Sequence, residues 1–322
     1  MKSFIIGAND AGQRVDKFLQ KAVKRLPINL MYKYIRTKKI KVNGKRCKEF
    51  DILKQDDIVA LYIKDEFFDT IFTEYPFLQA PDKVDAVYED ENIIILNKPS
   101  GLIVHEDENE NIDTLINRVM HYLFKKGEYN PMLENSFAPA LCNRIDRNTE
   151  GLVIAAKNAG ALRLINEKIK LREINKYYLT IVHGKFDVKS NTLTAYLSKD
   201  AEQNTVYVTD RPATRDSKTI KTRYKVISEN DRFSLVEIEL LTGRTHQIRA
   251  HMAHIGHPLL GDTKYGTNKL NKGTGFKHQV LCSYKLEFKF MTSSNEFDYL
   301  NGLVAEVPSV KFYDDFLRGK IK

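Results

Sequence analysis

The chain has 322 residues, 42% of them hydrophobic and 29% charged, which is enough for a full hydrophobic core and for two domains. No apolar run approaches the ~20 residues of a membrane span and the N-terminus lacks the apolar region of a signal peptide, so we expect a cytoplasmic protein with no membrane partner. The three cysteines are odd in number and far apart, which argues against a disulfide framework or a thiolate metal site.

The formal net charge of +9 is concentrated at one end of the chain. Residues 1–64 contain 16 Lys and Arg against 6 Asp and Glu, whereas the remainder is nearly neutral. A basic segment of this density is often only a solvated surface. In front of a nearly neutral body, it also fits a polyanion-binding module attached to a second domain.

Residues 1–65 are expected to form this basic module. Apolar residues at helical spacing predict a helix near 15–23, and a second amphipathic pattern follows Pro27. The segment 40–46 is an alternating strand followed by an Asn-Gly turn, and 57–62 predicts a further strand.

Two segments of the module, RVDKFL and IKVNGKR, resemble the small αL RNA-binding module of a ribosomal protein and of many RNA-modifying enzymes. The basic residues cluster beside the predicted hairpin, with tyrosines between them. Contacts with RNA phosphates are therefore expected from three side chains. These are Arg36, Lys38 and Lys39.

Residues 66–83, interrupted by Pro76 and Pro81, are expected to be a linker that packs partly on the body. The larger domain then covers 84–322. Its first predicted elements are strands at 86–88 and 93–96, a tight turn at 98–101 and a helix near 115–124.

The stretch 141–156 reads LCNRIDRNTEGLVIAA and places one carboxylate between two guanidinium groups, just before an apolar strand. Asp146 therefore lies at the edge of the core, with Arg144 and Arg147 beside it. Nearby positive charge offsets desolvation, so this carboxylate is expected to stay ionised under a substrate, which suits a nucleophile or a base. The simpler alternative is an ion pair within a turn.

The next elements follow in order. Asn158 is expected to cap a helix with an apolar face at Leu162, Ile165 and Ile169. The segment 176–184 is apolar on both faces and predicts a central strand, in which a residue such as Tyr178 usually belongs to the core. Residues 191–224 predict two or three further strands.

The segment 234–256 predicts an alternating strand and then a short helix. Gly243 should end the strand, Thr245 can cap the helix, and Gly256 should end it. The helix should bury the apolar side chains of Ile248, Met252 and Ile255.

Four segments of the larger domain resemble the pseudouridine synthases that modify large-subunit ribosomal RNA and some transfer RNA. Residues 141–156 resemble the family's HRLDxxTSGL signature, with Asn143 in place of His and Glu150 in place of a small residue. Three further segments resemble other family motifs: NKPSGLIVH, KYYLTIVHG and LLTGRTHQIRAHMAHIGHPLLGDTKYG.

The resemblance implies an α+β fold, with a mixed, mostly antiparallel β-sheet and flanking helices after the basic module. It implies Asp146 as the nucleophile or base, Arg249 as its ion-pair partner, and Tyr178 as a ring that stacks on the base and serves in deprotonation. Lys98, Arg144 and Arg147 are then expected near the substrate. This substrate would be structured RNA, ribosomal in the first place and transfer RNA as the alternative, and the enzyme a monomer without a cofactor.

Other functions fit the sequence less well than pseudouridine synthesis. An RNA-binding factor that has the same fold without catalysis is the main alternative, because Asn143 and Glu150 depart from the family pattern. A glycoside hydrolase needs a second carboxylate, which no matched motif supplies, and both a GxSxG elbow and a P-loop are missing. Four clustered histidines could suggest a metal, but no HExxH pair or ligand spacing supports one, so no metal is expected. They are His246, His251, His254 and His257.

Overall fold

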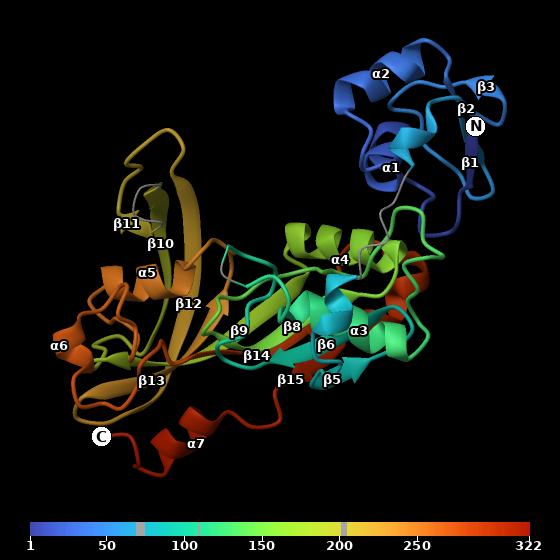
Figure 1. Cartoon of the computed structure of the whole chain (residues 1–322). Helices are drawn as coiled ribbons and strands as arrows, with labels where there is room; N and C mark the ends of the chain where they lie inside the picture. Colours follow the sequence, from blue (N-terminus) through green and yellow to red (C-terminus); the bar gives the residue numbers. More distant parts are fainter. Residues whose placement is uncertain (69–74, 109, 201–204) are drawn as a thin grey trace.

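The computed structural model describes residues 1–68, 75–108, 110–200 and 205–322. Figure 1 shows a small N-terminal module at one end and a larger domain built on a long sheet. Within the described ranges, none of the helices has both the length and the apolar composition to span a bilayer.

The N-terminal module packs two helices on a four-stranded sheet of order β1-β4-β2-β3. Its core combines residues from both helices and from the sheet, because the apolar positions recur at helical and strand spacing. The elements are β1 (Lys2–Ile5), α1 (Val15–Ala22), α2 (Ile28–Arg36), β2 (Ile40–Val42), β3 (Lys45–Arg46) and β4 (Ile58–Leu61).

Both predicted helices and the predicted hairpin of the module are confirmed. Asn43 and Gly44 have φ values of 49° and 73°, as a tight two-residue hairpin turn requires. Strand β1 was not predicted. It pairs with β4 through Lys2↔Leu61, so its partner is remote in sequence, and Ile5 is exposed, which hides the alternation.

The segment predicted as a linker contributes to both cores. Phe67 and Phe68 pack against the module, and Phe77 is buried in the core of the larger domain. Two short 3₁₀ helices, η1 (Asp65–Phe67) and η2 (Pro76–Gln79), flank residues 69–74, which lie outside the described residues. The domain boundaries at 65 and 84 stay a prediction.

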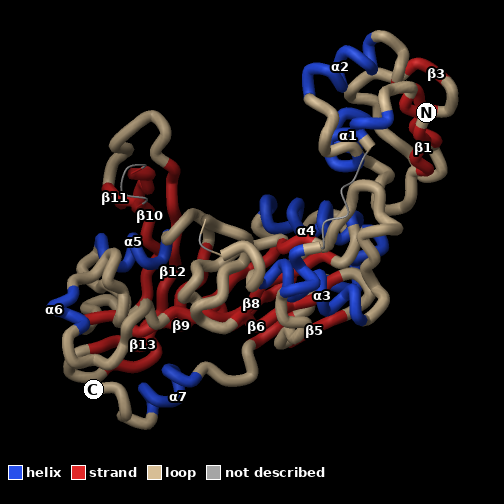
Figure 2. The backbone as a smooth tube through the Cα atoms, in the orientation of Figure 1, coloured by secondary structure: helices blue, strands red, loops and turns tan. Residues whose placement is uncertain are grey.

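The larger domain is built on one sheet of order β11-β10-β12-β13-β9-β14-β8-β6-β5, with β15 paired to β14 and β7 paired to β8. The pairs are antiparallel except β14 with β8, which is parallel. The mixed, mostly antiparallel sheet with flanking helices is therefore confirmed. Figure 2 shows the sheet turning upward at β12 and β10.

The predicted strands and helices between residues 86 and 256 are present, whereas β7, α6, β14, η3, β15 and α7 were not predicted. The strands are β5 (Ala86–Glu89), β6 (Ile93–Lys98), β7 (Ala140–Leu141), β8 (Glu150–Ala156), β9 (Ile174–His183), β10 (Ser190–Asp200), β11 (Thr205–Thr209), β12 (Lys218–Glu229), β13 (Phe233–Leu240), β14 (Leu281–Phe288) and β15 (Val304–Glu306). The helices are α3 (Leu115–Lys125), α4 (Ala159–Leu171), α5 (Gln247–His254), α6 (Asn268–Asn271), η3 (Asn295–Leu300) and α7 (Lys311–Leu317).

The predicted helix ends are confirmed at two of three positions. Asn158 caps α4 as predicted, since its Oδ1 accepts the Ala161 N–H at 2.8 Å. The predicted Thr245 cap of α5 is wrong. His246 occupies that position with a φ of 52°, and no side-chain hydrogen bond caps the helix. Gly256, with a φ of 88°, ends α5 as predicted.

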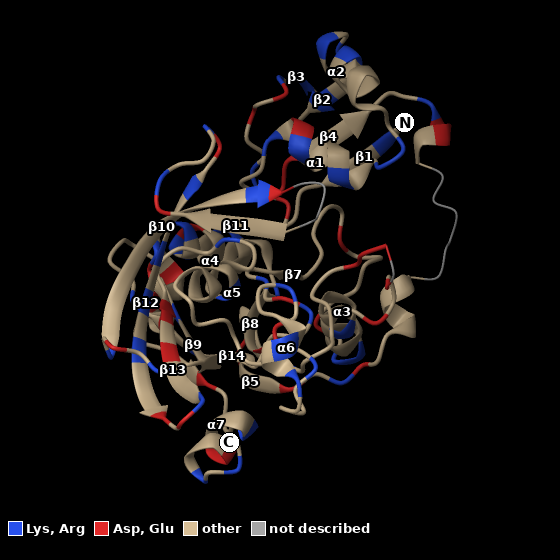
Figure 3. Ribbon diagram, turned by 90° about the vertical axis from the view of Figure 1, so that its left-hand side faces the viewer, with Lys and Arg blue, Asp and Glu red and all other residues tan. Residues whose placement is uncertain are grey.

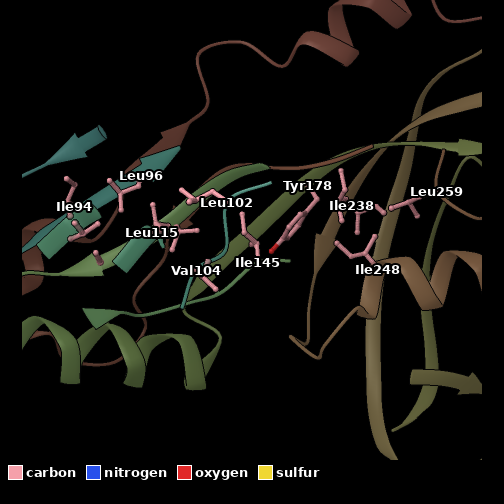
Figure 4. Packing of buried hydrophobic residues seen from close by; sticks show 14 of the residues in the cluster. Ile94, Leu96, Leu102, Val104, Leu115, Ile145, Tyr178, Ile238, Ile248 and Leu259 are labelled. Carbon is pink, nitrogen blue, oxygen red and sulfur yellow. The ribbon is translucent and has the colours of Figure 1, made fainter. Parts of the chain in front are cut away.

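Strand β9 lies in the middle of the sheet, between β13 and β14, as predicted. Figure 4 shows the Tyr178 ring between Ile145 and Ile238 in the main core, which continues past Leu102 and Leu115. The strand that carries this tyrosine is therefore held from both sides, which fixes the position of its side chain.

Polar contacts dock the module on the larger domain. Asn9 Nδ2 donates to Glu134 Oε1 at 2.8 Å, and the Ser136 hydroxyl donates to Asp10 Oδ1 at 2.6 Å. Gln13 Nε2 donates to the same hydroxyl at 2.8 Å. In Figure 1 the module and the β10–β12 arm stand on either side of α4.

Candidate active site

The loop before β8 carries Asp146 and rests on the turn at residues 98–101. The main-chain oxygen of Arg147 accepts two hydrogen bonds from this turn, from Lys98 Nζ at 2.8 Å and from the Gly101 N–H at 2.9 Å. The Ser100 hydroxyl donates to the Asn148 oxygen at 3.0 Å. The turn therefore fixes the backbone on the C-terminal side of Asp146.

The surroundings of Lys98 give it a structural role, and its place near the substrate stays a prediction. Its side chain is fully buried, and Nζ also donates to the oxygens of Pro99 at 2.9 Å and Leu102 at 2.7 Å. Burial lowers the pKa of Lys98 to about 8, although the charges of Asp146 and Glu150 oppose that shift. Because three carbonyls use its three hydrogens, Lys98 supports the loop.

The start of β8 is in direct contact with β14. A Cβ on Gly151 would lie 2.2 Å from the Ser283 oxygen, and the φ of this glycine is +106°. Any other side chain here would push the two strands apart. This close approach places the Asp146 loop at the edge of the central strands.

Asp146 belongs to a chain of three charged side chains. Arg249 Nη1 donates to Asp146 Oδ2 at 2.9 Å, and Arg249 Nε and Nη2 donate to the two oxygens of Asp262 at 2.7 and 3.0 Å. The Asp262 side chain is 0% exposed, Arg249 9% and Asp146 27%. The Arg249 guanidinium is thus held by a buried carboxylate and presents one N–H to a partly open one.

The electrostatics of this chain favour the charged forms. Burial alone would raise the pKa of Asp262, but the hydrogen bonds and charge of Arg249 hold it below its usual value. The two carboxylates likewise outweigh burial and raise the pKa of Arg249. Asp262 lies within the last motif that matched the family, yet nothing in the sequence indicated which arginine it binds.

His246 and Tyr265 complete this side of the site. His246 Nδ1 hydrogen-bonds to the Tyr265 hydroxyl at 2.8 Å, and His246 Nε2 lies 3.8 Å from Asp146 Oδ2. The Tyr265 ring also packs against the Arg249 guanidinium at 5.2 Å. Burial lowers the pKa of His246 more than the Asp146 charge raises it, so the imidazole is neutral at pH 7. Sequence reasoning weighed His246 only as a metal ligand and missed Tyr265.

A cavity of about 280 Å³ opens beside these residues. Asp146, Arg249 and Tyr178 all line it, so the structure brings together the three residues for which catalytic roles were predicted. Tyr178 is 5% exposed, and burial raises its pKa to about 12, with a smaller contribution from the Asp146 charge. The volume of the cavity is near the lower end of the range for ligand pockets, ~300–1,000 Å³.

The two arginines predicted near the substrate, Arg144 and Arg147, occupy different places. Arg144 lines the cavity and is exposed. Arg147 does not line the cavity, and its Nη2 donates to Asp107 Oδ2 at 2.8 Å at the surface. Arg244, an exposed residue for which the sequence suggested no role, lines the cavity as well.

The three predicted RNA contacts of the module lie away from this cavity. Arg36, Lys38 and Lys39 are exposed, and Lys39 Nζ lies 5.2 Å from the Tyr34 ring centroid. Figure 3 shows Lys and Arg distributed over α1, α2 and the neighbouring strands of the module. Their contact with RNA stays a prediction.

The two departures from the family signature leave the Asp146–Arg249 pair intact. Asn143 Oδ1 accepts the Ile154 N–H at 2.8 Å and so ties the loop to β8. Glu150 is partly buried, and burial raises its pKa against the opposing charge of Lys98. Neither side chain displaces the carboxylate or its arginine.

The four clustered histidines face four different partners. A ring nitrogen of His251 hydrogen-bonds to the Thr222 hydroxyl at 2.9 Å, and one of His254 to Asp210 Oδ1 at 2.9 Å. A ring nitrogen of His257 hydrogen-bonds to the His183 oxygen at 3.0 Å. Among the described parts of the chain, no group of three or more His, Cys, Asp and Glu could hold a metal ion.

Comparisons with known proteins agree with this architecture. Residues 92–254 match the family model described as RNA pseudouridylate synthase. An RNA pseudouridine synthase of Mycoplasma capricolum is 34% identical over 318 residues, which covers 94% of this chain and 96% of that protein. Ribosomal large subunit pseudouridine synthase C of Buchnera aphidicola is 32% identical over 271 residues, covering 83% and 82% of the two chains.

A solved structure has the same fold. Human RNA pseudouridylate synthase domain containing 4 matches with a TM-score of 0.56 and 19% identity, covering 73% of this chain and 92% of that one. The matched family model and the relatives define an RNA-modifying isomerase. The chain belongs to the RNA pseudouridylate synthase family and is an RNA pseudouridine synthase.

Proposed function

We propose that this enzyme isomerises specific uridines in structured RNA with Asp146 paired to Arg249. The observation that carries the proposal is the 2.9 Å contact between Arg249 Nη1 and Asp146 Oδ2 in a cavity that Tyr178 also lines. Large-subunit ribosomal RNA is the proposed substrate, supported by relatives named ribosomal large subunit pseudouridine synthase C. Transfer RNA is the alternative, and we expect a cytoplasmic monomer.

The chemistry needs few groups. The bond from ribose C1′ to uracil N1 breaks, the uracil rotates, and a bond from C1′ to C5 forms. C5 loses a proton and N1 gains one. No electrons are transferred and no phosphate leaves, so the reaction as written requires no cofactor.

Asp146 is the proposed nucleophile or base in this reaction. Its Oδ2 is oriented by Arg249, which is itself fixed by Asp262. A carboxylate held this way reaches a fixed position without reorganising when substrate arrives. Attack on the sugar, attack on the base, and removal of a sugar proton are all compatible with this arrangement.

Tyr178 is proposed to stack on the uracil and to serve in the deprotonation of C5. Because burial raises its pKa to about 12, its hydroxyl is protonated at neutral pH. A neutral phenol can accept the C5 proton only while it gives up its own. The stacking role rests on the ring alone and does not depend on this exchange.

The target base must leave its stack in folded RNA before it can enter the cavity, at a cost of a few kcal/mol. Arg144, exposed at the cavity, is proposed to hold the displaced backbone or to fill the vacated place. The module residues Arg36, Lys38 and Lys39 would add affinity through phosphate contacts.

Mapping of isomerised uridines in RNA from cells with and without this protein tests the proposal. We expect one or a few sites in large-subunit ribosomal RNA to disappear without the protein and to return when it is restored. Loss of sites in transfer RNA alone would favour the alternative substrate. Identical maps from the two strains would contradict the proposed function.

A further inference from the structure

Lys176 lines the cavity but takes no part in the Asp146–Arg249–Asp262 chain. It lies two residues before Tyr178 on β9, and successive residues of a strand point to opposite faces. Lys176 and Tyr178 therefore project from the same face of the central strand into the same cavity.

The ammonium of Lys176 has no partner within the parts of the chain that the structure describes. No hydrogen bond or ion pair reaches its Nζ, although the side chain is partly buried. The one ionisable group that affects its pKa is Cys142. Burial raises the pKa of that thiol to about 12, so Cys142 is neutral at pH 7 and supplies no negative charge.

Three lysines of this domain whose side chains are more deeply buried are compensated. Lys98 Nζ donates to three main-chain oxygens. Lys168 Nζ lies 2.9 Å from Glu173 Oε2, and Lys157 Nζ lies 3.0 Å from Glu89 Oε1. Buried charges in proteins are normally paired in this way. Lys176, partly buried at the wall of the cavity, has no such partner among the described residues, and burial lowers its pKa to about 8.

A phosphate would satisfy the hydrogens of this ammonium and also neutralise its charge, whereas neutral oxygens such as those around Lys98 satisfy the hydrogens alone. Uracil and ribose are neutral, so the phosphates are the only anions that an RNA strand offers. Arg249 is already neutralised by two carboxylates, and Arg147 by Asp107.

We propose that Lys176 binds a backbone phosphate next to the uridine that occupies the cavity. This inference rests on the proposed function. Lys176 is a substrate-binding residue in this account, whereas Asp146 and Tyr178 act on the sugar and the base.

The test combines a protein change with an RNA change. The probe is a short RNA hairpin that carries the mapped uridine, made either unmodified or with a neutral methylphosphonate at the phosphate 5′ or 3′ to that uridine. Its dissociation constant and its single-turnover rate are measured for the wild type, Lys176→Met and Lys176→Arg. The control is Lys285→Met, a partly buried lysine that packs on the Tyr177 ring, on the opposite face of the same strands.

We expect the Lys176→Met variant to bind the unmodified hairpin about 10- to 100-fold more weakly, as for a lost hydrogen bond to a charged group. One methylphosphonate should weaken the wild type and Lys285→Met by a similar factor and leave Lys176→Met unchanged. Lys176→Arg should keep most of the affinity, which separates loss of charge from misfolding.

Two results would overturn the inference while the wild type remains active. The methylphosphonates could weaken Lys176→Met as much as the wild type, which would assign the phosphate contact to another group. Alternatively, Lys176→Met could lower the rate at saturating RNA without changing the dissociation constant, which would place Lys176 on the uracil. A wild type that forms no pseudouridine in the hairpin would instead contradict the proposed function.

Discussion

The cavity and the N-terminal module use positive charge in opposite ways. The Arg249 side chain is 9% exposed and lies between two carboxylates. The module residues Arg36, Lys38 and Lys39 are exposed, and none of them forms an ion pair within the described ranges. The Arg249 charge is already compensated inside the cavity, whereas the module leaves its charges available to a partner.

The difference indicates what each region contributes. A buried, compensated guanidinium adds little attraction for RNA, but it holds a neighbouring carboxylate in one position. Exposed lysines and arginines do not fix the position of a neighbouring group, but they release counterions from the RNA when they bind its phosphates. Changes to the Asp146–Arg249 pair should therefore alter the rate of the chemical step, and changes in the module should alter affinity and its salt dependence.

Apart from a change at Asp146 itself, the largest expected effect comes from Arg249→Met. Loss of the guanidinium should lower the single-turnover rate about 10³-fold. It should also reduce the free energy of unfolding by about 3–5 kcal/mol, because Asp262 is left buried without its partner. Rate assays and chemical denaturation measure the two effects.

The double variant Arg249→Met/Asp262→Asn separates these effects. Removing the orphaned charge should restore most of the stability and none of the activity. Recovery of activity together with stability would mean that Arg249 serves the fold alone.

Tyr178→Phe should have the next largest effect, a fall of about 10²-fold in the single-turnover rate. The ring remains and only the hydroxyl is lost, so RNA affinity should not change. A wild-type rate for Tyr178→Phe would remove the hydroxyl from the deprotonation step, and only the stacking role would remain.

The comparison extends to pH, because the module contains no histidine whereas the larger domain contains all eight. Burial lowers the pKa of His251, on α5, to about 4. The unfolded chain takes up this proton below about pH 6.5 and the folded chain does not. The contribution of neutral His251 to the free energy of unfolding is therefore fully present above about pH 6.5. It should fall by about 3 kcal/mol as the pH drops to 4.

Chemical denaturation between pH 7 and pH 4.5 measures this dependence. Replacement of His251 with Gln should flatten the dependence, and the same change at exposed His278 should not. Equal slopes for the two variants would contradict the assignment to His251.

The smallest effect is expected from the module. Replacing Arg36, Lys38 and Lys39 together with Gln should weaken RNA binding about tenfold at physiological salt. It should also reduce the salt slope by about 2–3, since each phosphate contact contributes about 0.7–0.9. The rate on saturating RNA should stay unchanged.

A matched control removes three positive charges near the C-terminus, at Lys311, Arg318 and Lys322, which are exposed. Both variants have the same net charge. Equal losses of affinity would show that total charge, not the position of the module residues, governs binding.

Local patterns predicted local structure well. The spacing of Val15, Phe18 and Leu19 identified α1, and the Asn43-Gly44 pair identified the hairpin, because both depend on neighbours in sequence. Strand β1 could not be predicted this way, since it exists through pairing with distant β4.

Prediction of the site from the sequence has the same limit, because it also depends on contacts that only the folded chain reveals. The motif resemblance singled out Asp146, Tyr178 and Arg249, and the fold places all three at one cavity. Which side chains satisfy one another could not be predicted. The Asp262 partner of Arg249 lies 13 residues away, and the Arg147 carbonyl that Lys98 binds lies 49 residues away. That no described residue pairs with Lys176 is likewise a property of the folded chain.

The most direct test of this account is Asp146→Asn, an almost isosteric change that removes the negative charge facing Arg249. Its single-turnover rate and dissociation constant on the mapped RNA should be measured with the same protein preparation. We expect no pseudouridine above background and an affinity within about threefold of the wild type. Pseudouridine formation at the wild-type rate would contradict the central role given to this carboxylate.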